Sequence, residues 1–150
     1  MMSELSIELN WKLGDGEMAV GKFSNAHEII FTPSHKIIID AAPDWGGSAL
    51  NTNPEQTLAA SLSSCHMMTF LALAVKVKWP VLSYNDKAIA YLGKNSKGQM
   101  SVTKITLQPK IKFSDGFAVE AEEMEKMQDR AHRYCFIANS LSEEVEVKIF

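Results

Sequence analysis

The N-terminal part of the chain alternates apolar and polar positions in the manner of half-buried strands. In "ELSIELNW", residues 4–11, every second residue is apolar, which is the period of a β-strand. The segment "LGDGE", residues 13–17, is rich in turn formers, so we expect residues 18–23 to return as the second strand of a hairpin. After the break at Thr32-Pro33-Ser34, the run "HKIIID", residues 35–40, predicts a third strand.

The middle of the chain changes from turn-forming residues to a long apolar run. Residues 41–52, "AAPDWGGSALNT", are too many for a tight connection and predict a functional or packed surface loop. Asn53 is a good N-cap, Pro54 suits the first helical position, and Gln56 can complete a capping-box-like arrangement. A helix should therefore begin here and continue to about Val77, ahead of Trp79-Pro80. Because it is apolar on nearly every face, we expect it to be surrounded by protein.

The C-terminal half predicts two strands, a helix and a last strand. Residues 81–92 and 100–113 are β-rich and are joined by the hairpin-type connection "GKNSKGQ". Apolar residues from Phe117 to Tyr134 then recur at helical spacing between acids and lysines, which predicts an amphipathic helix. Residues 144–149 alternate again. This order predicts an α+β fold with a largely antiparallel sheet, in one compact domain over residues 1–150.

Composition and charge narrow the class of protein. With 46% hydrophobic and 22% charged residues, the chain is expected to be globular. A net charge of −3 and only two arginines, Arg130 and Arg133, argue against a nucleic-acid partner. The apolar run of residues 58–75 is interrupted by serines, a cysteine and a histidine, so a core helix is expected and not a membrane span. The segment "MMSELSIELN" lacks the basic and apolar regions of a secretion signal, and we expect a cytoplasmic protein.

The two cysteines of the chain stand in two unlike segments. Cys65 lies inside the predicted apolar helix, and Cys135 follows the amphipathic helix in "AHRYCFIANS". Either one could simply be a packed core residue, because free cysteine is often buried. The alternative is that the two thiols meet and react. Two cysteines in a cytosolic protein do not indicate a stable disulfide framework.

Helix geometry limits what could activate Cys65. Its thiol lies about 18 Å along the axis from the helix start, so the positive end of its own helix cannot stabilise a thiolate. Glu55 would be about 15 Å away along the same helix, so a direct role beside Cys65 requires two copies of the helix side by side. Alone, Glu55 is more typical of an acid that complements the helix dipole. His66 points about 100° away from Cys65, which favours a packing or surface position.

Metal binding is a rival arrangement of the same residues. His132 and Cys135 are three positions apart, and Cys65 with His66 could complete four ligands. However, adjacent helical residues diverge, and structural zinc sites favour clearer ligand spacing. We therefore expect no metal.

The two cysteine segments resemble those of the OsmC/Ohr family of thiol-dependent organic hydroperoxide reductases. "NPEQTLAASLSSCHMMTFLALA" is similar to the family's Asn-Pro-Glu helix start and small-residue run into the first cysteine. "AHRYCFIANS" resembles its second-cysteine segment. The order of strands and helices agrees too, so the resemblance covers nearly the whole chain. It implies an OsmC-like fold: an intertwined homodimer with antiparallel sheets around long buried central helices.

The resemblance also implies an activity and its residues. Cys65 would attack an organic hydroperoxide and pass through a sulfenic acid, and Cys135 would resolve it as a disulfide. Glu55, as the acid of the Asn-Pro-Glu segment, would belong to the site at the dimer interface. A lipoyl-type dithiol would restore the thiols by exchange, and no metal or organic cofactor is implied.

One position departs from the family pattern. The family usually presents an arginine near the first cysteine, paired with the glutamate, and this chain has Asn25 there. Glu55 without that partner would oppose ionisation of a nearby thiol. The residues left as possible substitutes are Arg130, Arg133, His27 and Lys36. The alternative function is a dimer of the same fold with little peroxidase activity, which binds a small ligand or senses redox state.

Overall fold

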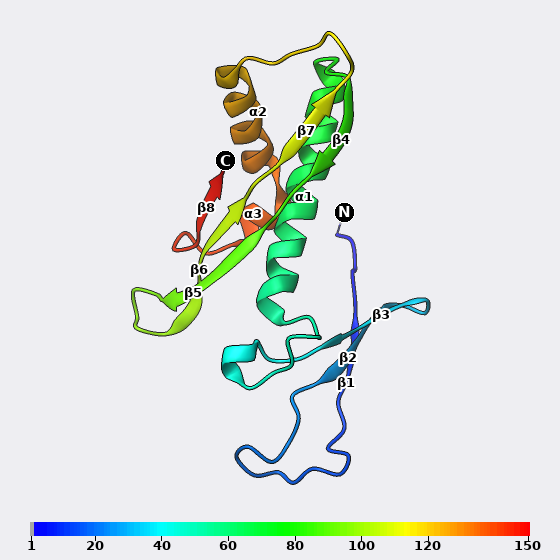
Figure 1. Cartoon of the computed structure of the whole chain (residues 1–150), viewed down its shortest axis with the longest axis vertical. Helices are drawn as coiled ribbons and strands as arrows, with labels where there is room; N and C mark the ends of the chain where they lie inside the picture. The colour runs from blue at the N-terminus through cyan, green and yellow to red at the C-terminus, as the bar shows by residue number, and fades with distance from the viewer. Residues whose placement is uncertain (1) are drawn as a thin grey trace. The chain divides into compact units, whose positions relative to one another are not determined.

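The computed structural model describes residues 2–150 and divides by internal contacts into two compact units. The first ends at Thr57 and the second begins at Leu58, and the elements of both are labelled in Figure 1. Helix α1 (Pro54–Lys76) begins in the first unit and continues into the second. The single domain over residues 1–150 stays a prediction.

The first unit is built on a three-stranded antiparallel sheet. Its order is β1 (Glu8–Asn10), β2 (His27–Thr32) and β3 (His35–Ile39), with β2 in the centre. β2 and β3 form a tight hairpin in which Thr32 pairs with His35 and His27 with Ile39. Residues 35–39 are the strand that the sequence predicts.

The predicted strand over residues 18–23 is wrong. That segment forms turns, in which Glu17 N–H donates to the Lys22 carbonyl and Lys22 N–H donates to that of Ala19. Gly21 adopts a φ of 72°, outside the extended range. The strand that pairs with β1 is instead β2, with Glu8 opposite Ile30. β1 itself spans less of residues 4–11 than the alternation predicts.

The loop over residues 41–52 is confirmed, and its own contacts hold it in place. The Asp40 carboxylate accepts hydrogen bonds from the N–H groups of Ala41, at 2.8 Å, and Ser48, at 3.0 Å. A short 3-10 helix, η1 (Pro43–Trp45), follows Asp40. Gly47 has to be glycine because a Cβ there would lie 1.6 Å from the Ala41 carbonyl oxygen. This loop is therefore a packed one.

Helix α1 starts with the predicted capping box. Gln56 N–H donates to Asn53 Oδ1 at 2.9 Å, and Asn53 N–H donates to Gln56 Oε1 at 3.1 Å. These two bonds satisfy donors that a helix N-terminus otherwise leaves free. The helix ends at Lys76, one residue before the predicted end, and Lys78 takes a φ of 62° where the chain leaves it.

Within one chain, α1 is buried on one face and not on all of them. The buried positions follow helical spacing: Ala59, Leu62, His66, Phe70, Leu73 and Ala74. On the other side Met68 is 57% exposed and Val75 is 75% exposed. The sequence predicted that protein would surround this helix. Within one chain, protein covers only one side of α1. α1 is long and apolar enough to span a membrane, but core helices pass the same test, and its fully buried Leu62, His66 and Phe70 are those of a core helix.

The second unit contains a long bent hairpin and a last strand. Its arms are β4 (Val81–Asn85) with β5 (Ile89–Lys94), and β6 (Met100–Leu107) with β7 (Lys110–Phe113). β4 pairs with β7 and β5 with β6, all antiparallel, as predicted. The final strand, β8 (Glu146–Ile149), pairs with β6 in parallel. Figure 1 shows the two arms of the hairpin running side by side through the second unit.

Both arms of the hairpin are interrupted at the same level. Pro109 lacks an N–H donor, so the ladder cannot continue through it. The Asp86 carboxylate fills part of the gap by accepting from the N–H of Gln108, at 2.6 Å, and from the Ser63 hydroxyl of α1. This carboxylate therefore connects the bend of the sheet to the middle of α1.

Two further helices complete the second unit. α2 (Ala121–Tyr134) is the predicted amphipathic helix and buries Met127, Gln128 and Ala131. Cys135 ends α2 and also caps α3 (Phe136–Ser140). The apolar core has two parts. Leu62 of α1 packs with Ile105 and Leu107 of β6 in one, and Phe70 of α1 packs with Met127 and Ala131 of α2 in the other.

Candidate functional site

The structure brings the two cysteines together in the second unit. Cys65 lies on α1 and Cys135 at the junction of α2 and α3, and both belong to one apolar cluster with Leu62, Ile105 and Leu107. Both cysteines are free thiols. Cys135 is fully buried, whereas Cys65 is partly exposed. The more accessible thiol is the one inside the long helix.

The environment of Cys65 favours its thiolate. Burial is the largest influence and raises the pKa of Cys65, but hydrogen bonds from the N–H groups of Ile137 and Phe136 and from the Cys135 thiol together lower it below the ordinary value. Donors that point at a sulfur stabilise its charged form. The backbone donors belong to the first residues of α3. The segment that contains Cys135 thus supplies the groups that stabilise the thiolate of Cys65.

Cys135 has the opposite tendency. Burial and the neighbouring Cys65 raise the pKa of Cys135 to about 11, although its sulfur accepts the N–H of Ala138 at 3.4 Å. Cys135 therefore remains a thiol at neutral pH and donates towards Cys65. The pair has one sulfur suited to nucleophilic attack and one that holds a proton.

The main groups that lower the pKa of Cys65 are hydrogen-bond donors and not cations. Arg130 and Arg133 are exposed on α2. In the first unit, Lys36 forms an ion pair with Glu28 at 3.9 Å, and His27 Nδ1 lies 2.7 Å from the Asn25 carbonyl oxygen. Sequence reasoning looked for a charged side chain and missed the backbone donors of Phe136 and Ile137, because backbone donors leave no signature in residue type.

Glu55 lies in the first turn of α1, ten residues before Cys65. Since α1 is continuous between them, the two are about 15 Å apart along its axis. Glu55 Oε2 is buried and has no hydrogen-bond partner within residues 2–150 of this chain. A buried carboxylate oxygen without a donor is costly and calls for a partner.

His66 is a buried residue of α1, in keeping with the packing position that the sequence favours over a place beside Cys65. It is fully buried, and its Nε2 lies 2.6 Å from Oε1 of Gln128 on α2. Burial lowers the pKa of His66, so the ring is neutral. The partner could not be found by local pattern, because it is 62 positions away.

Among residues 2–150, no cluster of three or more histidine, cysteine or acidic side chains has the arrangement of a metal site. Of the four residues in the rival zinc arrangement, His66 uses its Nε2 in the contact with Gln128, and Nδ1 of His132 is buried without a hydrogen-bond partner within residues 2–150. The absence of metal stays a prediction.

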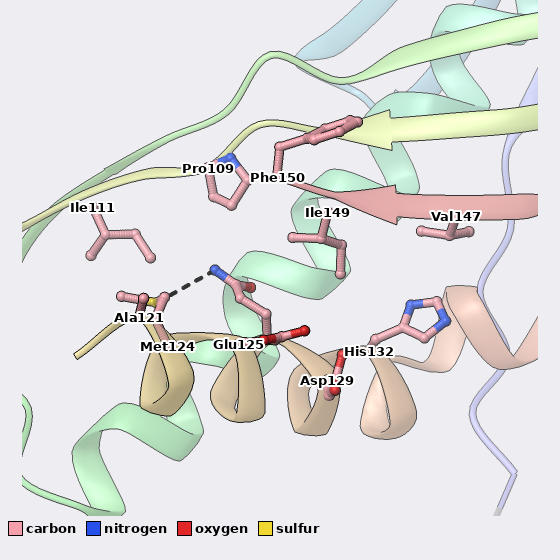
Figure 2. Close-up of a pocket in the computed structure, with 11 residues that line it drawn as sticks. Pro109, Ile111, Ala121, Met124, Glu125, Asp129, His132, Val147, Ile149 and Phe150 are labelled. Atoms are coloured by element: carbon pink, nitrogen blue, oxygen red, sulfur yellow. Dashed lines mark hydrogen bonds between the residues drawn. The ribbon is translucent and has the colours of Figure 1, made fainter. Parts of the chain in front are cut away.

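A groove of about 440 Å³ lies elsewhere on the second unit, between α2 and strands β7 and β8. Figure 2 shows Glu125, Asp129 and His132 on its helical side, opposite Ile149 and the other apolar residues of the strands. Neither cysteine lines it. The buried Gln128 does, so the groove reaches the residue that holds His66.

Fold and site together define an α+β protein with two adjacent free thiols, one with a lowered pKa and one with a raised pKa. Comparison with known proteins identifies the family. Residues 46–150 match the family described as OsmC-like protein, and the chain belongs to that family. No curated protein sequence matches it significantly.

Solved structures agree with this assignment. An OsmC-like protein of unknown function from Vibrio cholerae is 42% identical, with a TM-score of 0.89 over 99% of this chain and 100% of that one. Two organic hydroperoxide resistance proteins, from Legionella pneumophila and Elizabethkingia anophelis, are each 18% identical, with a TM-score of 0.74 over 99% of this chain and 96% of theirs. At that identity, the last two share the fold alone. The expected OsmC-like α+β fold is confirmed.

Proposed function

We propose that this protein is a thiol-dependent peroxidase that reduces organic hydroperoxides with Cys65 and Cys135. The observation that carries the proposal is the pair itself: a thiolate-stabilised Cys65 beside a protonated Cys135. A two-step thiol reaction needs such an arrangement, because one sulfur has to attack first and the other has to follow.

In the first step, the Cys65 thiolate attacks the terminal oxygen of the hydroperoxide. A sulfur–oxygen bond forms, the oxygen–oxygen bond breaks, and the alcohol leaves after taking a proton, leaving Cys65 as sulfenic acid. That proton comes from the solvent, and the Cys135 thiol keeps its own proton through this step. Apolar neighbours such as Leu62 and Ile105 favour a hydroperoxide with an apolar body over hydrogen peroxide.

In the second step, Cys135 attacks the sulfur of the sulfenic acid. A disulfide forms and the hydroxyl leaves as water, so two thiols and one hydroperoxide give a disulfide, an alcohol and water. Loss of its proton to the departing oxygen would make Cys135 nucleophilic. A lipoyl-type dithiol would then reduce the disulfide by exchange, and neither a metal nor an organic cofactor takes part.

The working unit of the proposal is an intertwined homodimer in the cytoplasm. The apolar stripe that this chain leaves exposed on α1, represented by Met68 and Val75, supports pairing of two copies of the helix. Such pairing would also bring the buried Glu55 of one copy towards the thiols of the other, as the helix distance requires. The proposed catalytic set is Cys65, Cys135 and Glu55.

Steady-state turnover tests the proposal. With dihydrolipoamide as donor, we expect rapid reduction of cumene hydroperoxide, slower reduction of hydrogen peroxide, and no turnover by Cys65→Ser above the uncatalysed rate. The serine variant is the matched control because it changes one atom at the reacting position. Equal activity of wild type and Cys65→Ser would refute the proposal.

The groove on the second unit favours one alternative, a member of the family that binds a small ligand or senses redox state. Its volume of about 440 Å³ suits a small molecule, and its apolar wall carries polar groups on one side. The two functions differ at Cys65: the peroxidase needs a reactive thiolate, and the ligand-binding protein does not. An unreactive Cys65 at neutral pH, with no turnover, would favour the alternative.

A further inference from the structure

We propose that the hydrogen bond between His66 and Gln128 is a positioning contact for the thiol pair, which holds the α2–α3 junction against Cys65. The inference rests on the thiol pair of the proposed function. It adds two residues, His66 and Gln128, that touch neither the substrate nor the reacting sulfurs. They act through the backbone that carries Cys135.

The hydrogen bond between His66 and Gln128 joins the two helices that carry the cysteines. His66 is the residue after Cys65 on α1. Gln128 lies on α2, seven residues before Cys135, at which that helix ends. The donors for Cys65, the N–H groups of Phe136 and Ile137, follow directly. Any sliding or rotation of α2 relative to α1 would therefore move these donors away from the sulfur.

Packing elsewhere between the two helices is apolar and does not define a single register. Met127 and Ala131 of α2 pack with Phe70 and Leu73 of α1, contacts that tolerate small shifts. A hydrogen bond is directional and weakens when donor and acceptor lose their alignment, so it limits how far one helix can rotate or slide against the other. The 2.6 Å bond between His66 and Gln128 is thus the contact that fixes the register beside the thiols.

The polar atoms of the pair are arranged for this one contact. With its Oε1 towards His66, Gln128 turns its Nε2 to the sulfur of Met124 at 3.8 Å, so the ring of His66 is the donor through Nε2. The other ring nitrogen, Nδ1, is buried and has no partner within residues 2–150. A leucine at either position would fill the space without a buried polar atom. Burying a polar pair at this depth costs stability. A positioning role explains why a polar pair is nevertheless present.

The test measures the pKa of Cys65 from the pH dependence of its alkylation by iodoacetamide, without any peroxide. In Gln128→Leu we expect the pKa to rise and alkylation at pH 7 to slow by about fivefold, the effect of losing one ordinary hydrogen bond to the thiolate. Gln128→Asn, which is too short to reach His66, should shift the pKa in the same direction and is the milder variant if Gln128→Leu folds poorly.

Two controls separate positioning from general loss of stability. Met127→Ala weakens the same helix contact without touching the bond, so it should lower the melting temperature and leave the pKa of Cys65 unchanged. The double variant His66→Leu/Gln128→Leu removes the orphaned polar atoms, so it should regain stability while the pKa stays raised. A wild-type pKa in Gln128→Leu or in the double variant, or an equal rise in Met127→Ala, would overturn the inference. A wild-type Cys65 with an ordinary thiol pKa would instead count against the proposed peroxidase.

Discussion

Placing two glutamates on the exposed face of α1, in Met68→Glu/Val75→Glu, should convert the proposed dimer to monomer. These side chains are seven residues apart on one helical face and are 57% and 75% exposed in the single chain. An exposed apolar stripe on the longest helix is the surface that a second copy would cover. Burying an unpaired carboxylate costs several kcal/mol per group, and a symmetric interface would contain each one twice.

Light scattering coupled to size exclusion measures this result at micromolar concentration. The wild type should elute at twice the mass of the chain and the double variant at the mass of one chain. Met100→Glu, at a half-exposed apolar residue at the start of β6, is the matched control and should remain dimeric. A wild type that is already monomeric, or a double variant that stays dimeric, would contradict the proposed assembly.

Replacing Cys135 by serine should stop turnover and leave the first chemical step intact. Cys65 would still be oxidised to sulfenic acid, but no second thiol would be present to displace the hydroxyl. The serine hydroxyl takes the place of the S–H group as a hydrogen-bond donor to Cys65, so the pKa of Cys65 should stay lowered and the first step should keep the pH dependence of the wild type. The sign follows from the bond: a donor stabilises the thiolate, and an O–H group donates as an S–H group does.

Mass spectrometry after one equivalent of cumene hydroperoxide distinguishes the outcomes. Cys135→Ser should gain one oxygen atom at Cys65 and should react with a sulfenic-acid reagent such as dimedone. Cys65→Ser, the reciprocal control, should be unchanged, because Cys135 has a pKa of about 11 and stays protonated. Full turnover by Cys135→Ser would show that Cys135 does not resolve the intermediate.

The parts of this fold that local sequence determines could be predicted. The start of α1 depends on Asn53 and Gln56, three positions apart, and both bonds of the predicted capping box are present. The strand at residues 35–39 and the helix ending at Tyr134 follow from periodicity alone. In each case, the residues that decide the structure are neighbours along the chain.

The features that were predicted wrongly, or could not be predicted, depend on partners far away in the sequence. Alternation and a turn favoured a return strand at residues 18–23, but β1 pairs with β2, and only the pairing of whole strands decides between them. His66 could be placed away from Cys65 by helix geometry, whereas its contact with Gln128 could not be foreseen.

The sequence predicted that the two thiols would meet, but it did not predict which groups surround Cys65, and the catalytic role of these residues stays a prediction. Resemblance of two segments selected Cys65 and Cys135, and the structure brings these thiols together. Because Asn25 stands where the family usually has an arginine, the sequence suggested that another charged side chain would take its place. The structure instead gives Cys65 the N–H groups of Phe136 and Ile137, which any residue type could supply.

The central claim is that Cys65 and Cys135 react as a pair with an organic hydroperoxide. The most direct measurement adds one equivalent of cumene hydroperoxide to the fully reduced protein and counts free thiols by titration and intact mass. We predict loss of both thiols, a mass lower by two hydrogen atoms, and a rate that falls when the pH drops below the lowered pKa of Cys65. Two intact thiols after complete mixing at neutral pH would contradict it.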